Sequence, residues 1–528
     1  MVRSEIKNLL LSAVRKLYGD ISIPKFSLES PENPEHGDYA TNVAMVLAKI
    51  LKKNPMEIAS AIAEELRTKN LEFRTEVASP GFINFFLSAE VLYSELGEIL
   101  KKKKKYGKLQ IAKSAAQKIN IEFVSANPTG PLTMANGRGG FYGDVLANVL
   151  EAYGHKVTRE YYINDAGNQI KLLEESIAAA EGKLPPKDEY YRGDYINKLK
   201  GWSGKKAVVM ILGWIGASLR KAEIKFDVWF SEDQKLRKAG EVKRVLEDFK
   251  GRSLLAKKDG AVWFGDRVFV KSNGDPTYLL VDITYQRNKL AGRKFDQAIT
   301  VIGADHYAEA AQVRTGLTAL GISENRFRAI IIQMVRLISG GKEVRMSKRK
   351  GAFIAIDELI DEVGLDAARY FFLERSPDTH MDFDLDLAKE RSVKNPVYYI
   401  QYAHARIASI FKKALPSRHS EAEGRRISTR SFASLRMTTL REPEELILIK
   451  KLVQLPEIIE DTVNDYQVHR LTRYAYELAR AFHNFYEKHR VITDDPKLST
   501  ARLALVKATQ IVLQITLGLL GIKAPDRM

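Results

Sequence analysis

The sequence of 528 residues contains no cysteine. That absence excludes disulfides, cysteine-ligated zinc, iron–sulfur clusters and thiol nucleophiles. Its nine histidines show neither an HExxH pattern nor tight clustering, so no structural metal is expected. Any chemistry of this chain must therefore rest on charged, hydroxyl and backbone groups.

Long apolar runs are also missing. The longest, Ala207–Leu219, has 13 residues, short of the ~18–20 that span a bilayer, and it predicts a buried helix. The leucine run at 9–11 is too short for a secretory signal. We therefore expect a cytoplasmic protein without a membrane partner.

Positive charge is in excess. Lys and Arg number 83 against 66 Asp and Glu, a net charge of +17, with a pI near 9.5. Such a surplus favours a polyanionic partner, nucleic acid before an anionic membrane surface. A merely basic soluble surface is the alternative that composition leaves open. The length predicts about two to four domains.

Residues 1–105 read as a separate α+β unit. Apolar periodicity predicts an opening helix, followed by a loop of turn formers and by helices at 39–53 and 55–67. A strand pair is predicted within 73–87, with its turn at 79–81. The five lysines at 101–105 form either a solvated linker or a contact for phosphate.

Residues 106–390 read as a Rossmann-like catalytic domain with a parallel, doubly wound sheet. Short apolar segments between helical stretches predict its strands, while 182–265 is less regular and reads as an insertion. The predicted strands are 119–123, 156–163, 268–271, 278–282, 298–302 and 329–334.

From about 391 to 528 the pattern is helical throughout. Helices are predicted at 397–414, 444–465, 468–489 and 500–520. The stretch 417–442 is rich in Ser, Thr and Arg and lacks periodicity, so it predicts a flexible loop.

Two features fall at predicted strand ends, where doubly wound sheets bind ligands. The strand at 119–123 breaks at Asn127-Pro128-Thr129-Gly130-Pro131 and resumes as a helix, a joint whose free backbone N–H groups suit an anion. Residues 340–351, GGKEVRMSKRKG, form a cationic loop after another strand. Together they predict a site for nucleoside triphosphate.

The motifs SANPTGPL, VRMSKRKG and DAARYFFL occur in that order, and with them the chain resembles class I aminoacyl-tRNA synthetases, most closely arginyl-tRNA synthetases. The resemblance implies ligation of L-arginine to its tRNA through an arginyl-adenylate, with ATP as substrate and Mg²⁺ accompanying it. It also implies an N-terminal tRNA-binding domain and a C-terminal α-helical anticodon-binding domain. A monomer is expected.

By this resemblance, Arg345-Met346-Ser347-Lys348-Arg349 corresponds to the family's lysine loop, with Lys348 on the pyrophosphate side of the transition state and Arg345 keeping the charge of the first lysine. The family's His-X-Gly-His signature is replaced by Thr133-Met134-Ala135-Asn136, whose side chains can donate hydrogen bonds but carry no charge. Catalytic roles are expected for Lys348, Arg345, Thr133 and Asn136, and ATP contacts for Pro131, Thr133, Asn136, Gly137, Arg138, Met346, Ser347 and Lys348.

The lost histidines leave two functions open. The reaction needs no protein nucleophile, so positioning and electrostatics can sustain an active ligase. The alternative is a catalytically impaired paralogue that binds tRNA.

Arginine needs carboxylates, because a planar guanidinium pairs with them in a bidentate manner. The resemblance assigns the substrate's amino and carboxylate groups to Glu122, Ser125 and Asn127, and the guanidinium to Tyr278 and Asp282. His306, in GADHY, is either an active-site residue or a structural histidine.

For tRNA, aromatic and cationic side chains gather at the start of the C-terminal helices. Stacking on unpaired bases plus charge is how single-stranded loops are read, although some of these rings are expected to pack the helical core. The candidates are Tyr398, Tyr399, Tyr402, His404 and Arg406. The resemblance adds Asn33 and His36 of the N-terminal unit.

Overall fold

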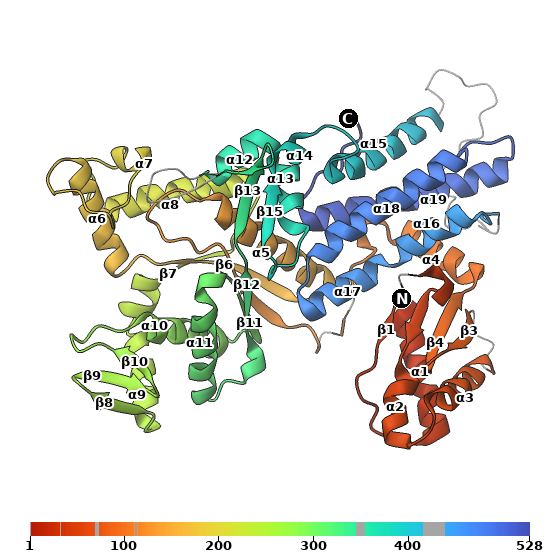
Figure 1. Cartoon of the computed structure of the whole chain (residues 1–528), viewed down its shortest axis with the longest axis horizontal. Helices are drawn as coiled ribbons and strands as arrows, with labels where there is room; N and C mark the ends of the chain where they lie inside the picture. Colours follow the sequence, from red (N-terminus) through yellow and green to blue (C-terminus); the bar gives the residue numbers. More distant parts are fainter. Residues whose placement is uncertain are drawn as a thin grey trace.

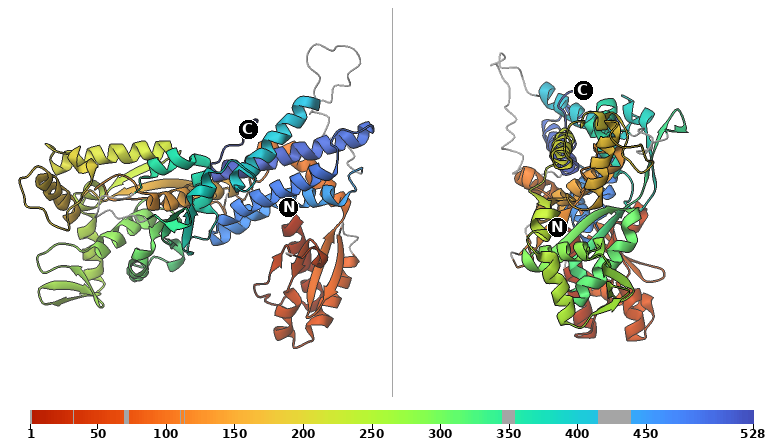
Figure 2. Two further views of the ribbon diagram at one scale, coloured as in Figure 1. Left: turned by 45° about the horizontal axis from the view of Figure 1, so that its top comes forward. Right: turned by 90° about the vertical axis from the view of Figure 1, so that its left-hand side faces the viewer.

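A computed structural model describes residues 2–31, 33–68, 73–109, 111–112, 114–344, 354–414 and 439–528. A central parallel sheet lies between two layers of helices, with a bundle of long helices on one side of it (Figure 1). The N-terminal unit lies beside that bundle, as the left view of Figure 2 also shows. The molecule is therefore elongated rather than spherical.

The N-terminal unit is an antiparallel sheet of order β1-β2-β4-β3 covered by helices. The predicted helix 55–67 and the strand pair within 73–87 are confirmed. The helix predicted at 39–53 starts only at Val43, because Tyr39–Thr41 pairs with β4 as a strand. The elements are α1 Val2–Tyr18, β1 Leu28–Glu29, η1 Pro34–His36, β2 Tyr39–Thr41, α2 Val43–Leu51, α3 Pro55–Arg67, β3 Phe73–Ala78 and β4 Phe82–Leu87, followed by α4 Ala89–Lys102 and the turn η2 Lys103–Lys105.

The central sheet has the strand order β12-β11-β5-β6-β7, and all its neighbours are parallel. The chain winds outward from β5 through β6 to β7 and then returns to β11 and β12 on the other side. The strand order therefore reverses between β5 and β11, the switch point at which such sheets bind ligands. The strands are β5 Lys118–Glu122, β6 Lys156–Ile163, β7 Val228–Ser231, β11 Gln297–Gly303 and β12 Phe327–Ile332.

Helices cover both faces of this sheet, which confirms the doubly wound class. Ile119 and Ile121 of β5 join the core that contains α5, while Tyr162 of β6 and Ala298 of β11 join a second core with α10 and α11. The helices of this region are α5 Met134–Tyr153, α6 Asn168–Ala180, α7 Asp194–Asn197, α8 Gly204–Lys221, α9 Glu241–Gly251, α10 Tyr278–Arg287 and α11 Tyr307–Ala319.

Two expectations in this region are wrong. Residues 278–282 begin helix α10, which follows Thr277, although their branched apolar residues resemble a strand. The predicted strand 268–271 exists as β10 Arg267–Val270, but it belongs to a small antiparallel sheet with β8 Leu255–Lys258 and β9 Ala261–Phe264. In addition, 182–265 is not wholly an insertion, since β7 is the edge strand of the central sheet.

A second small sheet and several short elements complete this part of the chain. Strands β13 and β15 run parallel, and β14 pairs with β13 as a hairpin. These elements are β13 Val335–Ser339, β14 Lys342–Glu343, β15 Met381–Asp384, α12 Ile356–Val363, α13 Leu365–Leu373 and α14 Leu385–Lys389, with the turns η3 Asp233–Arg237, η4 Asn288–Gly292, η5 Ala304–His306 and η6 Glu324–Arg326.

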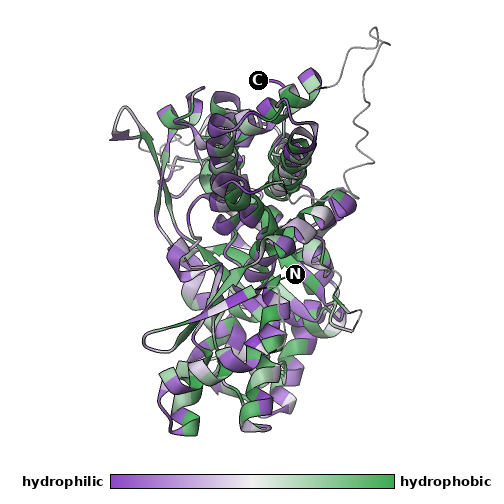
Figure 3. Cartoon of the chain, turned by 90° about the vertical axis from the view of Figure 1, so that its right-hand side faces the viewer, coloured by the Kyte–Doolittle hydropathy of each residue, from purple (hydrophilic) through white to green (hydrophobic). Residues whose placement is uncertain are grey.

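The C-terminal part is helical, as predicted, and its helices alternate hydrophilic with hydrophobic residues (Figure 3). The segment 444–465 forms two helices rather than one, with Pro456 in the first turn of the second. The predicted flexible loop lies mostly within 415–438, outside the described residues. The helices are α15 Pro396–Ala414, α16 Pro443–Val453, α17 Leu455–Asp465, α18 His469–Lys488 and α19 Pro496–Leu520.

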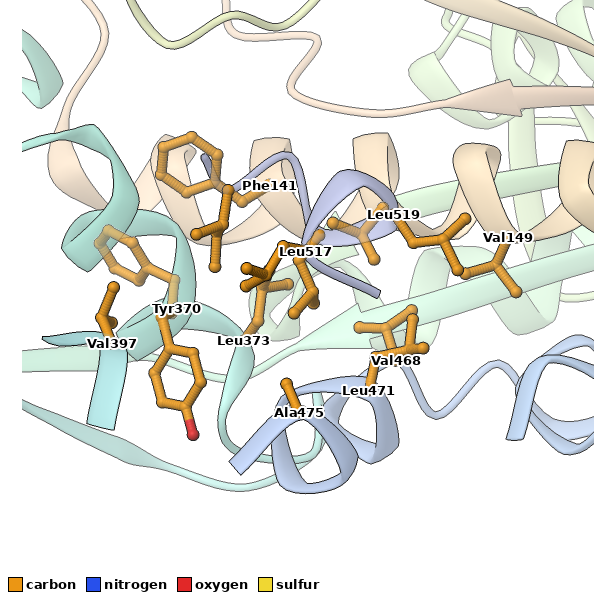
Figure 4. Close-up of a cluster of buried hydrophobic side chains, with 14 of the residues drawn as sticks. Phe141, Val149, Tyr370, Leu373, Val397, Val468, Leu471, Ala475, Leu517 and Leu519 are labelled. Atoms are coloured by element: carbon orange, nitrogen blue, oxygen red, sulfur yellow. The ribbon is translucent and has the colours of Figure 1, made fainter. Parts of the chain in front are cut away.

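Helix α19 is long and apolar enough to span a membrane by composition alone, but most of that stretch is buried inside the protein. Its Leu517 and Leu519 lie near Phe141 and Val149 of α5 in one cluster of buried side chains (Figure 4). The helix that follows β5 and the C-terminal helices therefore share a single core.

The N-terminal unit contacts α17 through a buried carboxylate. Glu457 accepts hydrogen bonds from the Tyr39 hydroxyl at 2.7 Å and from the Arg3 backbone N–H at 3.2 Å. The Arg3 guanidinium binds Glu460 and Asp461, and Lys450 binds Asp38 at 2.7 Å. Burial raises the pKa of Glu457 to about 7, although Arg3 opposes that shift.

This raised pKa predicts a pH-dependent stability. The folded protein binds a proton at Glu457 that the unfolded chain has lost, so this contribution to stability is present near pH 4.5 and is lost as pH rises through 7. Between pH 5.5 and 8, Glu457→Gln should therefore flatten the fall of the thermal unfolding midpoint, measured by circular dichroism. An unchanged slope would contradict this assignment.

Candidate active site at the sheet switch point

The chain leaves β5 in a strained conformation. Val124 and Ser125 both have positive φ, 66° and 36°, a region that branched residues rarely occupy. The Ser125 hydroxyl accepts a hydrogen bond from the Tyr162 backbone N–H at 3.1 Å, which ties the turn to β6. Such strain concentrates at functional sites because the surrounding structure must enforce it.

The signature residues cap helix α5. Thr133 is its N-cap, and the Asn136 carbonyl oxygen accepts hydrogen bonds from the Thr133 backbone N–H and hydroxyl, both at 2.9 Å. The side-chain oxygen of Asn136 thus stabilises the helix start, which leaves its amide N–H groups as the donors for a ligand. Thr133 and Asn136, which stand where the family signature has histidines, therefore both take part in capping α5.

The segment that follows the lysine loop is bonded to this same turn. The Met134 backbone N–H donates to the Ile354 carbonyl at 3.0 Å, and the Ile356 N–H donates to the Leu132 carbonyl at 3.1 Å. The Ile356 side chain packs closely over Gly137, where an added Cβ would lie 2.5 Å from Ile356 Cδ1. The predicted lysine-loop residues Arg345, Met346, Ser347 and Lys348 lie outside the described residues.

Arg138 does not fit the prediction that it adds a cation to the turn. Its side chain is 1% exposed, and its guanidinium donates to the Gln333 and Ser376 carbonyls at 2.8 and 2.9 Å. Burial lowers the pKa of Arg138 to about 10. A buried guanidinium that is bonded to two carbonyls serves packing rather than phosphate binding.

Beside the turn lies a buried cluster of acid–base pairs. Glu122, at the end of β5, accepts from Lys289 at 2.7 Å and from Thr300 of β11 at 3.2 Å. Lys289 is fully buried, and its ammonium also lies 4.0 Å from the centre of the Tyr285 ring. The Glu122 carboxylate therefore has one internal cation as its partner.

Two more pairs surround the first. Glu160 of β6 accepts from Arg293 at 2.8 Å and from the Tyr285 hydroxyl at 2.6 Å. Glu232 accepts from Arg237 at 2.6 Å and from the Tyr162 hydroxyl at 2.7 Å. Each buried carboxylate in these pairs is compensated, as low-dielectric surroundings require.

Asp282 differs from these acids because it has no hydrogen bond or ion pair with any residue that the structure describes. Burial, and then the nearby carboxylates Glu309 and Glu122, raise its pKa well above the ordinary value. Tyr278 lies one helical turn before it on α10 and is 49% exposed. The helical spacing, which the strand prediction missed, places both side chains on one face.

The other predicted arginine and ATP contacts lie around the same edge. Asn127 is exposed, Ser125 and Pro131 are partly buried, and all three belong to the turn after β5. His306 follows β11 at the switch point but is half exposed, with Nδ1 2.7 Å from a Glu309 carboxylate oxygen. This pairing leaves both interpretations of His306 open.

Sequence reasoning missed Lys289, Glu160, Arg293 and Glu232. One signal was present: Glu160 directly precedes Tyr161, Tyr162 and Ile163 in a predicted strand, and a charged residue on a buried strand needs a partner. The identity of each partner depends on contacts between distant segments, which spacing along the chain does not reveal.

Three of the predicted anticodon residues lie one helical turn apart along α15. The Tyr398 and Tyr402 rings stack with centroids 6.3 Å apart, and Tyr402 stacks on His483 of α18 at 5.8 Å. The Arg406 guanidinium lies 4.6 Å from the Tyr402 ring centre. These three α15 residues are partly exposed.

The remaining tRNA candidates divide into packed and exposed residues. His404 is buried, with Nδ1 2.8 Å from the Pro525 carbonyl oxygen, which makes it a packing residue. Tyr399 packs against Tyr476 and His483. Asn33 and His36 are exposed in the loop before β2.

The cap at Asn136 gives a test by substitution. Asn136→Ala removes the acceptor for the Thr133 N–H, so the free energy of unfolding should fall by about 1 kcal/mol, the usual value of an N-terminal cap. Asn136→Asp keeps an acceptor and should retain most of that stability in urea unfolding. Equal losses in the two variants would contradict the capping role.

Comparisons with known proteins agree with this geometry. Residues 4–87 match the arginyl tRNA synthetase N terminal domain, residues 95–189 and 192–410 the class I (R) tRNA synthetase catalytic domain, and residues 400–528 the DALR anticodon binding domain.

Full-length relatives give the same result. The arginine–tRNA ligase of Carboxydothermus hydrogenoformans is 43% identical over 95% of this chain and 94% of its own, and that of Caldanaerobacter subterraneus is 41% identical over 100% and 99%. The Thermus thermophilus arginyl-tRNA synthetase structure shares the fold, with a TM-score of 0.79 at 21% identity over the whole of both chains. The chain therefore belongs to the arginyl-tRNA synthetase family.

Proposed function

We infer that this protein ligates L-arginine to tRNA at the expense of ATP. The observation that carries this inference beyond family membership is the charge balance at the switch point. Three buried carboxylates have internal cations, from Lys289, Arg293 and Arg237. Asp282 alone among these neighbouring acids has none within the described residues, so the site fits one further cation.

The shape of that cation follows from its surroundings. Asp282 and Tyr278 share one face of α10, so a carboxylate lies beside an exposed aromatic ring. A planar guanidinium pairs with a carboxylate through two N–H groups and also stacks on aromatic rings. We assign the guanidinium of arginine to Asp282 and Tyr278, and its α-amino and carboxylate groups to Glu122, Ser125 and Asn127.

Such a site also explains selectivity without a second, editing site. An apolar amino acid would leave Asp282 buried without a counter-charge, and polar sites of this kind discriminate by roughly 10⁴–10⁵-fold. A neutral analogue of arginine with the same shape would lack the positive charge that we assign to pairing with Asp282.

ATP is assigned to the start of α5. Pro131, Thr133, Asn136 and Gly137 form the turn, to which residues 354–356 are bonded. We also assign ATP contacts to Arg345, Met346, Ser347 and Lys348, which precede residues 354–356 in the sequence. Mg²⁺ would accompany ATP, bound to phosphate oxygens and to several water molecules. In this assignment Lys348 and Arg345 replace the charge that the missing histidines would have supplied.

The chemistry requires no protein nucleophile. A carboxylate oxygen of arginine attacks the α-phosphorus of ATP and pyrophosphate leaves; a ribose hydroxyl of tRNA then attacks the acyl carbon and AMP leaves. The protein contributes position and charge stabilisation. Thr133 and Asn136 supply neutral donors, and Lys348 stabilises the charge that develops on the pyrophosphate.

Transfer RNA is assigned to both ends of the chain. We propose that the partly exposed Tyr398, Tyr402 and Arg406 stack on anticodon bases, and that exposed Asn33 and His36 contact the outer corner of tRNA. On this assignment residues 1–105 and 391–528 are the tRNA-binding domains, and 106–390 the catalytic one.

The decisive experiment is charging of total tRNA with labelled arginine. We expect arginyl-tRNA to form in an ATP-dependent manner, and Lys348→Ala to lower the rate by about 10²–10³-fold, the usual cost of losing one stabilising donor. Absence of product above the Lys348→Ala background, while tRNA still binds in filter assays, would favour the impaired paralogue instead.

The arginine site has its own test. Asp282→Asn should lower kcat/KM for arginine by roughly 10²–10³-fold, because a buried charge pair loses one partner. Since Asp282 must ionise to bind guanidinium, KM for arginine should fall as pH rises in the wild type and vary less in the variant. Asp305→Asn, at an 81% exposed carboxylate beside the same strand end, is the matched control. Equal effects of the two substitutions would refute the assignment.

A further inference from the structure

A cavity that is open to solvent on one side lies away from the switch point. It has a volume of about 510 Å³ and is bordered by η2 and the linker after it, the end of α5, helix α17, the last turns of α19 and the C-terminal tail. Cavities of this size accommodate small organic ligands. None of the residues assigned above to arginine, ATP or tRNA lines it.

The wall of this cavity is mainly aliphatic. Ile459 of α17 and Ile515 and Leu519 of α19 contribute to it, with small residues at Ala152 and Ala524. A surface of this kind gains free energy when an apolar group displaces water from it. The lining therefore favours a ligand with an apolar body.

One buried polar group in the wall lacks a partner. Tyr106 is 3% exposed, and its hydroxyl has no hydrogen bond to any described residue. Buried hydroxyls are nearly always hydrogen-bonded, because leaving one unpaired is unfavourable. This hydroxyl is itself sealed from solvent, so a molecule in the cavity would meet the Tyr106 ring and not this donor.

Positive charge lines the same cavity. Lys104 and Lys108 are lining residues, and neither forms an ion pair with a residue that the structure describes. Lys507 lies two helical turns before the lining residue Gln514 on α19; its pKa is lowered by burial and then by nearby Lys103. Cations gathered beside an aliphatic cavity favour an anionic group on the ligand.

We propose that this cavity binds a small amphipathic anion, whose apolar body contacts Ile459, Ile515 and Leu519 and whose anionic oxygens accept from Lys104 and Lys108. A bound ligand would contact the linker after η2 as well as α5, α17 and α19. It would therefore stabilise the packing of that linker, which connects the N-terminal unit to the rest of the chain, against these helices. The assignment also gives a role to the lysine run at 101–105 other than that of a solvated linker.

Gly518 allows the cavity to be filled without disturbing its wall. It lines the cavity on α19, and a Cβ added there would meet no atom within 4 Å. Gly213 on α8 is likewise exposed and helical, with no atom within 4 Å of an added Cβ, but it lies outside the cavity. Gly518→Leu and Gly213→Leu are thus matched variants, of which only the first occupies the proposed site.

The test uses anilinonaphthalene sulfonate as the amphipathic anion, with full-length protein and saturating ATP and arginine to occupy the catalytic site. Fluorescence titration of the wild type should show a saturable component. Gly518→Leu should weaken that component at least tenfold, and Gly213→Leu should leave it unchanged.

Two results would overturn the proposal. The first is equal affinity of the wild type and Gly518→Leu for the probe. The second is a loss of tRNA affinity in Gly518→Leu together with displacement of the probe by tRNA. That second result would assign the cavity to a nucleotide of tRNA. If Gly518→Leu fails to fold, Lys104→Gln/Lys108→Gln decides the matter: it should weaken probe binding and reduce its dependence on salt, and unchanged binding would refute the site.

Discussion

The arrangement of this molecule depends on one buried guanidinium. Arg369 of α13 is 1% exposed and donates to the Asp144 carboxylate of α5 at 2.8 Å. It also donates to the Leu520 carbonyl at the end of α19 at 3.3 Å and to the Ala222 carbonyl at the end of α8 at 2.9 Å. Helix C-termini carry partial negative charge, so one cation satisfies two of them and an acid at once.

This contact leaves little freedom to the surrounding chain. Gly521 caps α19 with φ of 67°, and a Cβ there would lie 2.3 Å from an Arg369 nitrogen, so only glycine fits both the turn and the close approach. Removing the guanidinium would leave Asp144 buried without a counter-charge, typically a loss of about 3–5 kcal/mol. The helix that begins at the signature turn is thereby tied to the C-terminal helices.

The surroundings of Glu122 and the start of α5 differ in their charge. Around Glu122, three buried carboxylates form ion pairs with internal cations, whereas Asp282 forms no ion pair with a described residue. At the start of α5, Thr133 and Asn136 form a neutral cap, so the charge for a nucleotide must come from elsewhere. The departure from the family signature is therefore local, because the helix start is still capped and positioned.

The local pattern of apolar and polar residues was sufficient to predict most helices and strands. Periodicity of apolar residues predicted α3, β6 and the C-terminal helices, because helices and strands bury every third to fourth or every second residue wherever they pack. It failed at 278–282, where branched residues resemble a strand but packing against α11 favours a helix. Motif order also indicated the family, since each motif is a short contiguous run that can be read from the sequence.

Tertiary structure decided which charged side chains can reach a ligand and which are paired inside the protein. Arg138 follows the signature turn by only a few residues, yet the helix turns its side chain into the core. Lys289 and Glu122 are 167 residues apart, and no local signal joins them. Whether a side chain meets solvent, a ligand or an internal counter-charge depends on how distant segments pack, and the sequence alone determined only the elements that carry them.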